Sequence, residues 1–125
     1  MINETRKILN NPNLPITATT VRVPVTNCHS ESINIEFQNE IDIYEIKQML
    51  QNSEGIILVD DIENNIYPLA RKVNGYNEVF VGRIRRDFSI KNGLNMWVVA
   101  DNLRKGAATN AIQILEVLLN SKKDG

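Results

Sequence analysis

Apolar and polar residues alternate along several stretches of the chain, which is the pattern of strands that bury one face. Residues 32–37 and 78–86 show this alternation, so each is predicted to form a half-buried strand. Residues 56–59 are uniformly apolar and are expected to form a short buried strand, and residues 94–100 a longer one. Residues 16–25 are rich in β-branched side chains, which favour strands, so a further strand is predicted there.

Three other segments are predicted to be helical. In residues 42–51 the apolar side chains recur at helical spacing, and Asp42 is the expected N-cap of a capping box that Glu45 would complete. Residues 4–9 are expected to form a short helix that ends before the proline that follows, because proline disfavours helix in the residue that precedes it. Residues 103–119 are expected to form a long closing helix.

The order of these elements indicates an α+β fold. An Asn-Gly dipeptide at residues 92–93 marks a tight turn, so the strands on either side of it are expected to pair antiparallel. Strands and helices do not alternate regularly along the chain, as they would in a parallel α/β sheet. The prediction is therefore a mostly antiparallel sheet that is covered on one face by helices.

Composition narrows the classes of protein that the chain can represent. Its 125 residues suit one domain, and its formal net charge of −1 argues against the basic surface that nucleic acids require. No apolar run approaches the roughly 20 residues that span a bilayer, and the N-terminus lacks the features of a signal peptide. One cysteine excludes an internal disulfide, and no Cys/His cluster has the spacing of a metal site. A cytoplasmic protein without a nucleic-acid or membrane partner is expected.

Two side chains stand out as candidate chemical groups. Arg22 is flanked by valines, so it is either a solvated surface arginine or a guanidinium that holds a carboxylate through two hydrogen bonds. His29 is the only histidine, and it is either an exposed loop residue or a group that exchanges protons near neutral pH. Positions seven apart on a continuous strand face opposite sides, so the two side chains converge only if the chain bends, which Pro24 permits.

Cys28 directly precedes His29, and together they have the residue types of a nucleophile and its base. Adjacent side chains generally point apart, however, and catalytic Cys/His pairs are usually distant in sequence. Cys28 is therefore not expected to be a nucleophile. A small cysteine enzyme built on this pair stays open as an alternative, and it would require a thiol that reacts near neutral pH.

Three motifs carry a likeness to a known family. The first is TVRVPV at residues 20–25, followed by CHSES at residues 28–32. The second is VGRIRRD at residues 81–87, and the third is DNLRKGAATNA at residues 101–111. Together, and in this order, they resemble the C-terminal portion of aspartate-semialdehyde dehydrogenase, an NADP-dependent family of lysine, threonine and methionine synthesis. The resemblance runs from about Asn3 to about Glu116.

The resemblance implies roles for three residues. The family interconverts L-4-aspartyl phosphate and L-aspartate 4-semialdehyde plus phosphate. Arg22 matches the arginine that binds the α-carboxylate of the substrate, and His29 matches the acid/base histidine. Asn102 matches a residue that approaches the nicotinamide end of NADP.

The resemblance also implies how the chain is organised. Residues 1–101 correspond to part of a catalytic and dimerisation domain, similar to the C-terminal domain of glyceraldehyde-3-phosphate dehydrogenase. Residues 102–125 correspond to a C-terminal helix that packs on the cofactor domain. The family's NADP-binding domain and catalytic cysteine lie upstream of the matched region, so the chain alone is expected to be an inactive fragment that forms homo-oligomers. The alternative is an assembly module derived from the enzyme that does no catalytic work.

Overall fold

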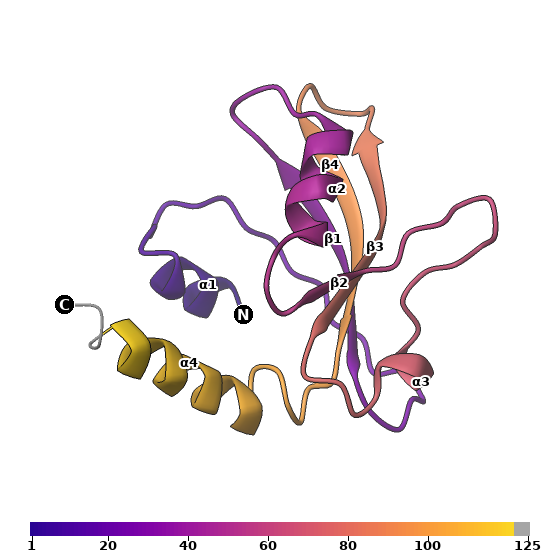
Figure 1. Ribbon diagram of the computed structural model, residues 1–125. Helices are drawn as coiled ribbons and strands as arrows, with labels where there is room; N and C mark the ends of the chain where they lie inside the picture. Colours follow the sequence, from indigo (N-terminus) through magenta and orange to yellow (C-terminus); the bar gives the residue numbers. More distant parts are fainter. Residues whose placement is uncertain (122–125) are drawn as a thin grey trace.

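One four-stranded sheet forms the centre of the computed structural model, which describes residues 1–121 (Figure 1). Its strands are β1 (His29–Glu36), β2 (Ile56–Leu58), β3 (Val79–Asp87) and β4 (Gly93–Ala100). They lie side by side in the order β1-β4-β3-β2. β4 pairs antiparallel with both β1 and β3, whereas β2 pairs parallel with β3. The predicted α+β fold with a mostly antiparallel sheet is confirmed.

The turn between β3 and β4 also contacts the segment that follows β1. At Gly93 a Cβ atom would come within 2.7 Å of the Cβ of Asp87, so a larger residue fits only if its neighbours shift. Asn92 is buried, and its side-chain amide donates to the backbone carbonyls of Phe37 and Gln38 at 3.3 and 3.2 Å. The predicted antiparallel pairing is therefore confirmed, although the connection is residues 88–92 and Gly93 is already the first residue of β4. Asn92 also holds the segment that leaves β1.

One face of the sheet is covered by α2 (Ile43–Gln51), which lies across it in Figure 1. Its apolar side chains pack against a buried cluster of the sheet that consists of Val81, Ile84 and Leu94. The Asp42 carboxylate accepts a hydrogen bond from the Tyr44 N–H at 2.7 Å, so the predicted N-cap is confirmed. Within residues 1–121 no hydrogen bond from the Glu45 side chain completes the predicted capping box.

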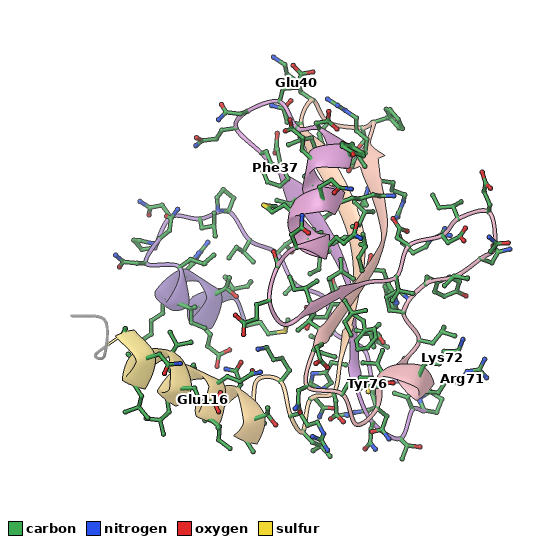
Figure 2. The ribbon with its side chains drawn as sticks, in the orientation of Figure 1. Phe37, Glu40, Arg71, Lys72, Tyr76 and Glu116 are labelled. Carbon is green, nitrogen blue, oxygen red and sulfur yellow. The ribbon has the colours of Figure 1, made fainter. Side chains whose placement is uncertain are left out.

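The opposite face packs against a helix that the sequence pattern did not predict, α3 (Ala70–Val73). The buried cluster on this face consists of Cys28, Val73, Phe80 and Val99. The rings of Tyr76 and Phe80 meet edge to face at 5.3 Å, and Arg71 and Lys72 point away from the sheet (Figure 2). The expectation of one covered face is therefore corrected, because a single helical turn is too short to show helical periodicity in the sequence.

A β-bulge interrupts β3 and changes which face its side chains occupy. The pairing of β3 with β4 shifts between Gly82 and Arg85, where two β3 residues lie opposite one β4 residue. Arg83, inside the bulge, has a φ of 54°, in the left-handed region that residues other than glycine seldom adopt. The extra residue brings Val81 and Ile84 into the same buried cluster, although positions three apart on a regular strand face opposite sides.

The carboxylate of Asp60 holds this bulge in place. It accepts hydrogen bonds from the backbone N–H groups of Arg83 and Ile84 at 2.7 and 3.3 Å. It also forms an ion pair with the Nζ of Lys47 at 2.7 Å, and its side chain is only 1% exposed. The buried charge is thus paired and hydrogen-bonded, and it satisfies two donors that the shifted strand pairing leaves available.

Two segments near the chain ends differ from the sequence predictions. Residues 16–25 are extended but join no strand of the described sheet, and Val21 is 82% exposed, so the predicted strand is wrong. α1 (Ile2–Ile8) forms close to its predicted place. α4 (Ala108–Ser121) begins later than residue 103, because Gly106 takes a φ of 83° that no α-helix contains.

α4 extends away from the sheet in Figure 1. The predicted domain division at residue 101 falls between the end of β4 and the start of this helix, and it stays a prediction. Residues 122–125 of the predicted C-terminal helix lie outside the described residues. In the part of the chain that the structure describes, no helix is both long and apolar enough to cross a membrane.

Replacing Asp60 by alanine is expected to lower the free energy of unfolding by about 2–4 kcal/mol, because two backbone donors and the Lys47 ammonium lose their acceptor. Urea denaturation followed by circular dichroism measures this. Asp42→Ala is the matched control, since it removes an exposed helix cap worth about 1 kcal/mol. Equal losses in the two variants would show that Asp60 does not hold the bulge.

Candidate active site

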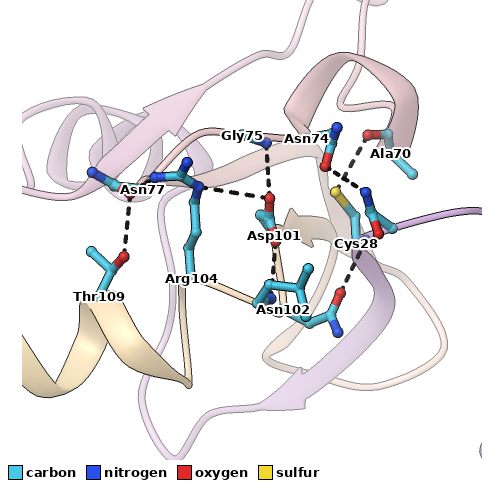
Figure 3. Close-up of polar contacts among 11 residues, drawn as sticks. Cys28, Ala70, Asn74, Gly75, Asn77, Asp101, Asn102, Arg104 and Thr109 are labelled. Carbon is cyan, nitrogen blue, oxygen red and sulfur yellow. Dashed lines mark hydrogen bonds and ion pairs between the residues drawn. The ribbon is translucent and has the colours of Figure 1, made fainter.

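A polar network joins three segments at one end of the sheet, where β4 ends, β1 begins and the turn after α3 passes (Figure 3). At its centre is Asp101, which is only 3% exposed. Its carboxylate accepts hydrogen bonds from the N–H groups of Gly75 at 2.8 Å and of Leu103 at 2.9 Å. The guanidinium of Arg104 lies 3.9 Å away. This carboxylate therefore connects the chain after β4 to the turn before β3.

These contacts set the charge of the network. The N–H of Gly75, followed by that of Leu103 and by the Arg104 guanidinium, lowers the pKa of Asp101 below its ordinary value of 3.8, although burial acts in the opposite direction. The carboxylate is therefore charged throughout the neutral range. A charged acceptor makes stronger hydrogen bonds than a neutral one, which suits a group that joins two segments.

Asn102 follows directly and makes the second connection. Its side-chain Oδ1 accepts a hydrogen bond from the backbone N–H of Cys28 at 3.0 Å. The Nδ2 of Asn27 donates to the Oδ1 of Asn74 at 3.0 Å, so the residues just before β1 are held from two sides. The Asn102 amide nitrogen points away from Cys28 in Figure 3, and its side chain is only partly buried.

Cys28 is a structural residue in this arrangement. It is 5% exposed, and its Sγ donates to the carbonyl oxygen of Ala70 at 3.4 Å. Burial, followed by the nearby charge of Asp101, raises the pKa of the Cys28 thiol. A buried thiol that stays protonated is a poor nucleophile, so the geometry gives no support to a small cysteine enzyme built on Cys28 and His29.

His29 is the first residue of β1 and is exposed. It pairs with Ala100, which precedes Asn102 by two positions, so the predicted acid/base residue and the predicted cofactor residue lie at the same end of the sheet. The hydrogen bond from Cys28 to Asn102 connects the two chain segments directly. An exposed imidazole at a fixed strand end can exchange protons with a bound ligand or with water.

Arg22 is placed differently from the prediction. It is exposed in the extended segment before β1, and among residues 1–121 no hydrogen bond or ion pair holds its guanidinium. The expected bend between Arg22 and His29 is present, since the Val25 N–H donates to the Val23 carbonyl across Pro24 at 2.9 Å. The role of Arg22 in binding a carboxylate stays a prediction.

The residues that hold the site are mostly ones that sequence reasoning did not single out. Asn27, Asn74 and Gly75 form the partner side of the network, with contacts that cross 47 residues in one case and 26 in the other. The Asn-Gly pair at residues 74–75 carries a turn signal, but a turn signal does not reveal a distant partner. Asp101 carries the signal of a cap, and it does cap the Leu103 N–H, at a turn rather than at a helix.

Comparison with solved structures places the fold in the class of dehydrogenases. The chain superposes on the crystal structure of aspartate semialdehyde dehydrogenase II from Vibrio cholerae, complexed with ASA, with a TM-score of 0.88 and 44% identity over 96% of this chain and 35% of that one. Residues 1–105 match the family described as "Semialdehyde dehydrogenase, dimerisation domain". The chain belongs to this family.

Its relatives carry the same name as the resemblance inferred from the motifs. The chain is 52% identical over 119 residues to the aspartate-semialdehyde dehydrogenase of Aquifex aeolicus and 54% identical over 119 residues to that of Prochlorococcus marinus. These matches cover 95% of this chain and 35% of each relative. The chain thus spans about a third of the length of the curated relatives that it matches, and the predicted family is confirmed.

When the pH is lowered, the Asp101→Asn variant is expected to lose less unfolding free energy than the native chain. The pKa of Asp101 is lower in the folded chain than in the unfolded one. Its contribution to stability is therefore fully present at pH values above the ordinary pKa of 3.8, and it is lost as the pH falls through the pKa of the folded chain. The difference in unfolding free energy between the native chain and Asp101→Asn should therefore shrink between about pH 5 and about pH 2. Urea denaturation at a series of pH values measures it.

Asp87→Asn is the control for this measurement. Its pKa is also lowered, chiefly by the hydroxyl and N–H of Ser89, but the group is more exposed, so solvent screens its contribution. A pH-independent difference between the native chain and Asp101→Asn would contradict the assignment of a charged, hydrogen-bonded carboxylate at this position.

Proposed function

We propose that this chain provides the dimerisation and substrate-site portion of an NADP-dependent aspartate-semialdehyde dehydrogenase. The reaction is the interconversion of L-4-aspartyl phosphate and L-aspartate 4-semialdehyde plus phosphate. The observation that carries the proposal is the 52% identity over 95% of the chain to a relative of that name. His29 and Asn102 come from the same end of the sheet, which adds support from the geometry.

His29 is proposed as the acid/base residue. The reaction passes through a covalent bond between the substrate's carbonyl carbon and a thiol, and an imidazole, which can both accept and donate a proton, can take up and return the protons involved. The exposed imidazole at the start of β1 is free to reach such a substrate. Its backbone is fixed from the preceding residue, which suits a group that must keep its orientation.

Arg22 is proposed to bind the α-carboxylate of the substrate. A guanidinium holds a carboxylate through two parallel hydrogen bonds, which fixes the orientation of the ligand as well as its charge. The exposed guanidinium of Arg22 has its donors available for this, since among residues 1–121 no contact occupies them.

Asn102 is proposed to contact the nicotinamide end of NADP. Because Oδ1 already accepts the Cys28 N–H, the outward-facing Nδ2 is the available group, and it is a donor that suits an acceptor such as a carboxamide oxygen (Figure 3). The chain contains no GxGxxG motif, so its part in holding the cofactor is limited to contacts of this kind. When bound, NADP supplies the hydride that the reduction of the acyl group requires.

The proposed partner is a second copy of the same protein, as the family's description as a dimerisation domain supports. Residues 102–125 are proposed to pack on a cofactor domain. Several apolar side chains of α4 are more than half exposed, which supports a covering partner for this helix. These are Ile112, Ile114, Leu115, Val117, Leu118 and Leu119. We infer a cytoplasmic setting for this reaction, without a nucleic-acid or membrane partner.

The isolated chain is expected to be inactive, because its single cysteine is buried and its thiol pKa is raised. Mixed with the part of the A. aeolicus relative that lies outside the matched region, it is expected to form NADPH from L-aspartate 4-semialdehyde in a phosphate-dependent way. His29→Ala should lower kcat by about 10²–10⁴-fold, and Arg22→Ala should lower kcat/KM by roughly 10–100-fold.

Arg85→Ala is the control, because Arg85 is an exposed arginine of β3 far along the sheet from His29, and it should leave the rate unchanged. Activity that survives His29→Ala would remove the proposed acid/base role. Two portions that associate but never turn over substrate would favour the alternative of an assembly module.

A further inference from the structure

We propose that Asn102 is a positioning residue, which sets the direction of His29 through the backbone of Cys28. This inference rests on the proposed function, in which His29 transfers protons, and it adds a role for Asn102 toward the histidine. The central observation is the hydrogen bond of 3.0 Å from the Cys28 N–H to the Asn102 Oδ1. It joins residues 74 positions apart, one directly before His29 and the other directly after Asp101.

The backbone of Cys28 needs such support. Its φ of 76° lies in the left-handed region, which residues with a side chain seldom adopt and which persists only where the surroundings enforce it. Cys28 is the last residue before β1, so this φ determines the direction in which His29 leaves the turn. A change of Cys28 to an ordinary strand conformation would rotate His29 away from the sheet end.

Among the contacts that hold the turn, the one from Asn102 acts on the backbone directly. The others run through side chains: the Cys28 Sγ donates to the Ala70 carbonyl at 3.4 Å (Figure 3), and Asn27 donates to Asn74 at 3.0 Å. A thiol is a weak donor, and the Asn27 contact is exposed to solvent. The partly buried N–H of Cys28 would lose its acceptor if residue 102 could not supply an oxygen.

Asn102 is itself held by its neighbour. Asp101 is buried and accepts two backbone hydrogen bonds, so the chain at residue 102 starts from a fixed point. A continuous set of contacts thus runs from Gly75 through Asp101 and Asn102 to Cys28 and then to His29. Proton transfer requires the donor and acceptor to lie within hydrogen-bond reach, and a displacement of about 1 Å can reduce the rate by about 10²-fold.

The test is the backbone order of His29 in this chain, measured by ¹⁵N relaxation. In Asn102→Ala the order parameter of the His29 N–H is expected to fall from about 0.85 to below about 0.6, while those of Val81 and Leu94 in the core remain high. Asn102→Asp should restore the native value, because aspartate keeps an oxygen acceptor at the same place. The aspartate also lacks the amide donor, so it separates positioning from the proposed cofactor contact.

Asn34→Ala is the matched control, since it removes two side-chain hydrogen bonds from the middle of β1. The proposal is overturned if Asn102→Ala leaves His29 as ordered as in the native chain, or if Asn34→Ala loosens His29 equally. If the alanine variant does not fold, the native chain still decides. A scalar coupling across the hydrogen bond between the Cys28 nitrogen and the Asn102 Cγ is expected, and its absence overturns the proposal.

These readouts need no turnover, so they separate this inference from the proposed function. A coupled, ordered His29 in a chain that never supports catalysis would remove the dehydrogenase role and leave the positioning contact intact. In an active mixture of the two portions, Asn102→Ala should lower kcat by about 10²-fold. Equal rates for Asn102→Ala and the native chain in that mixture would overturn the positioning role.

Discussion

The buried carboxylate of Asp101 accepts hydrogen bonds from two parts of the chain at once, and the position of the candidate site depends on it. A buried charge is tolerated only when donors surround it, and the donors here are the backbone N–H groups of Gly75 and Leu103. Meeting that requirement brings the turn before β3 against the segment that leaves β4. Asn102 is thereby placed where it can accept from Cys28, and the start of β1 is tied to the same point.

Much of the sheet could be predicted, because alternation and turn chemistry are local signals. The strands at residues 78–86 and 94–100 and the turn between them were found this way. The predicted strand at residues 16–25 failed because β propensity reflects packing on a pleated surface, and no neighbouring strand of the described sheet offers one there. The bulge at Arg83 was missed as well, since it depends on a buried aspartate that is 23 residues away in the sequence.

The candidate site was predictable only in part. The motifs identified the family and pointed to Arg22, His29 and Asn102, and the structure brings the last two to one end of the sheet. The residues that hold this end, Asn74 and Gly75 among them, were not identified because their partners lie far along the chain. Cys28 was not expected to be a nucleophile, and its burial and raised thiol pKa agree with that expectation. Its structural role was not predicted, because its hydrogen-bond partners lie far along the chain.

The most direct test of the account is native-state hydrogen exchange at the amides of the network. Opening of a hydrogen bond that belongs to the cooperative core requires the free energy of global unfolding, whereas loop amides exchange through small local fluctuations. The account predicts that the Gly75 and Cys28 amides exchange as slowly as the core amide of Val81. Exchange of Gly75 and Cys28 at the rate of an exposed loop would contradict the claim that Asp101 and Asn102 hold the candidate site together.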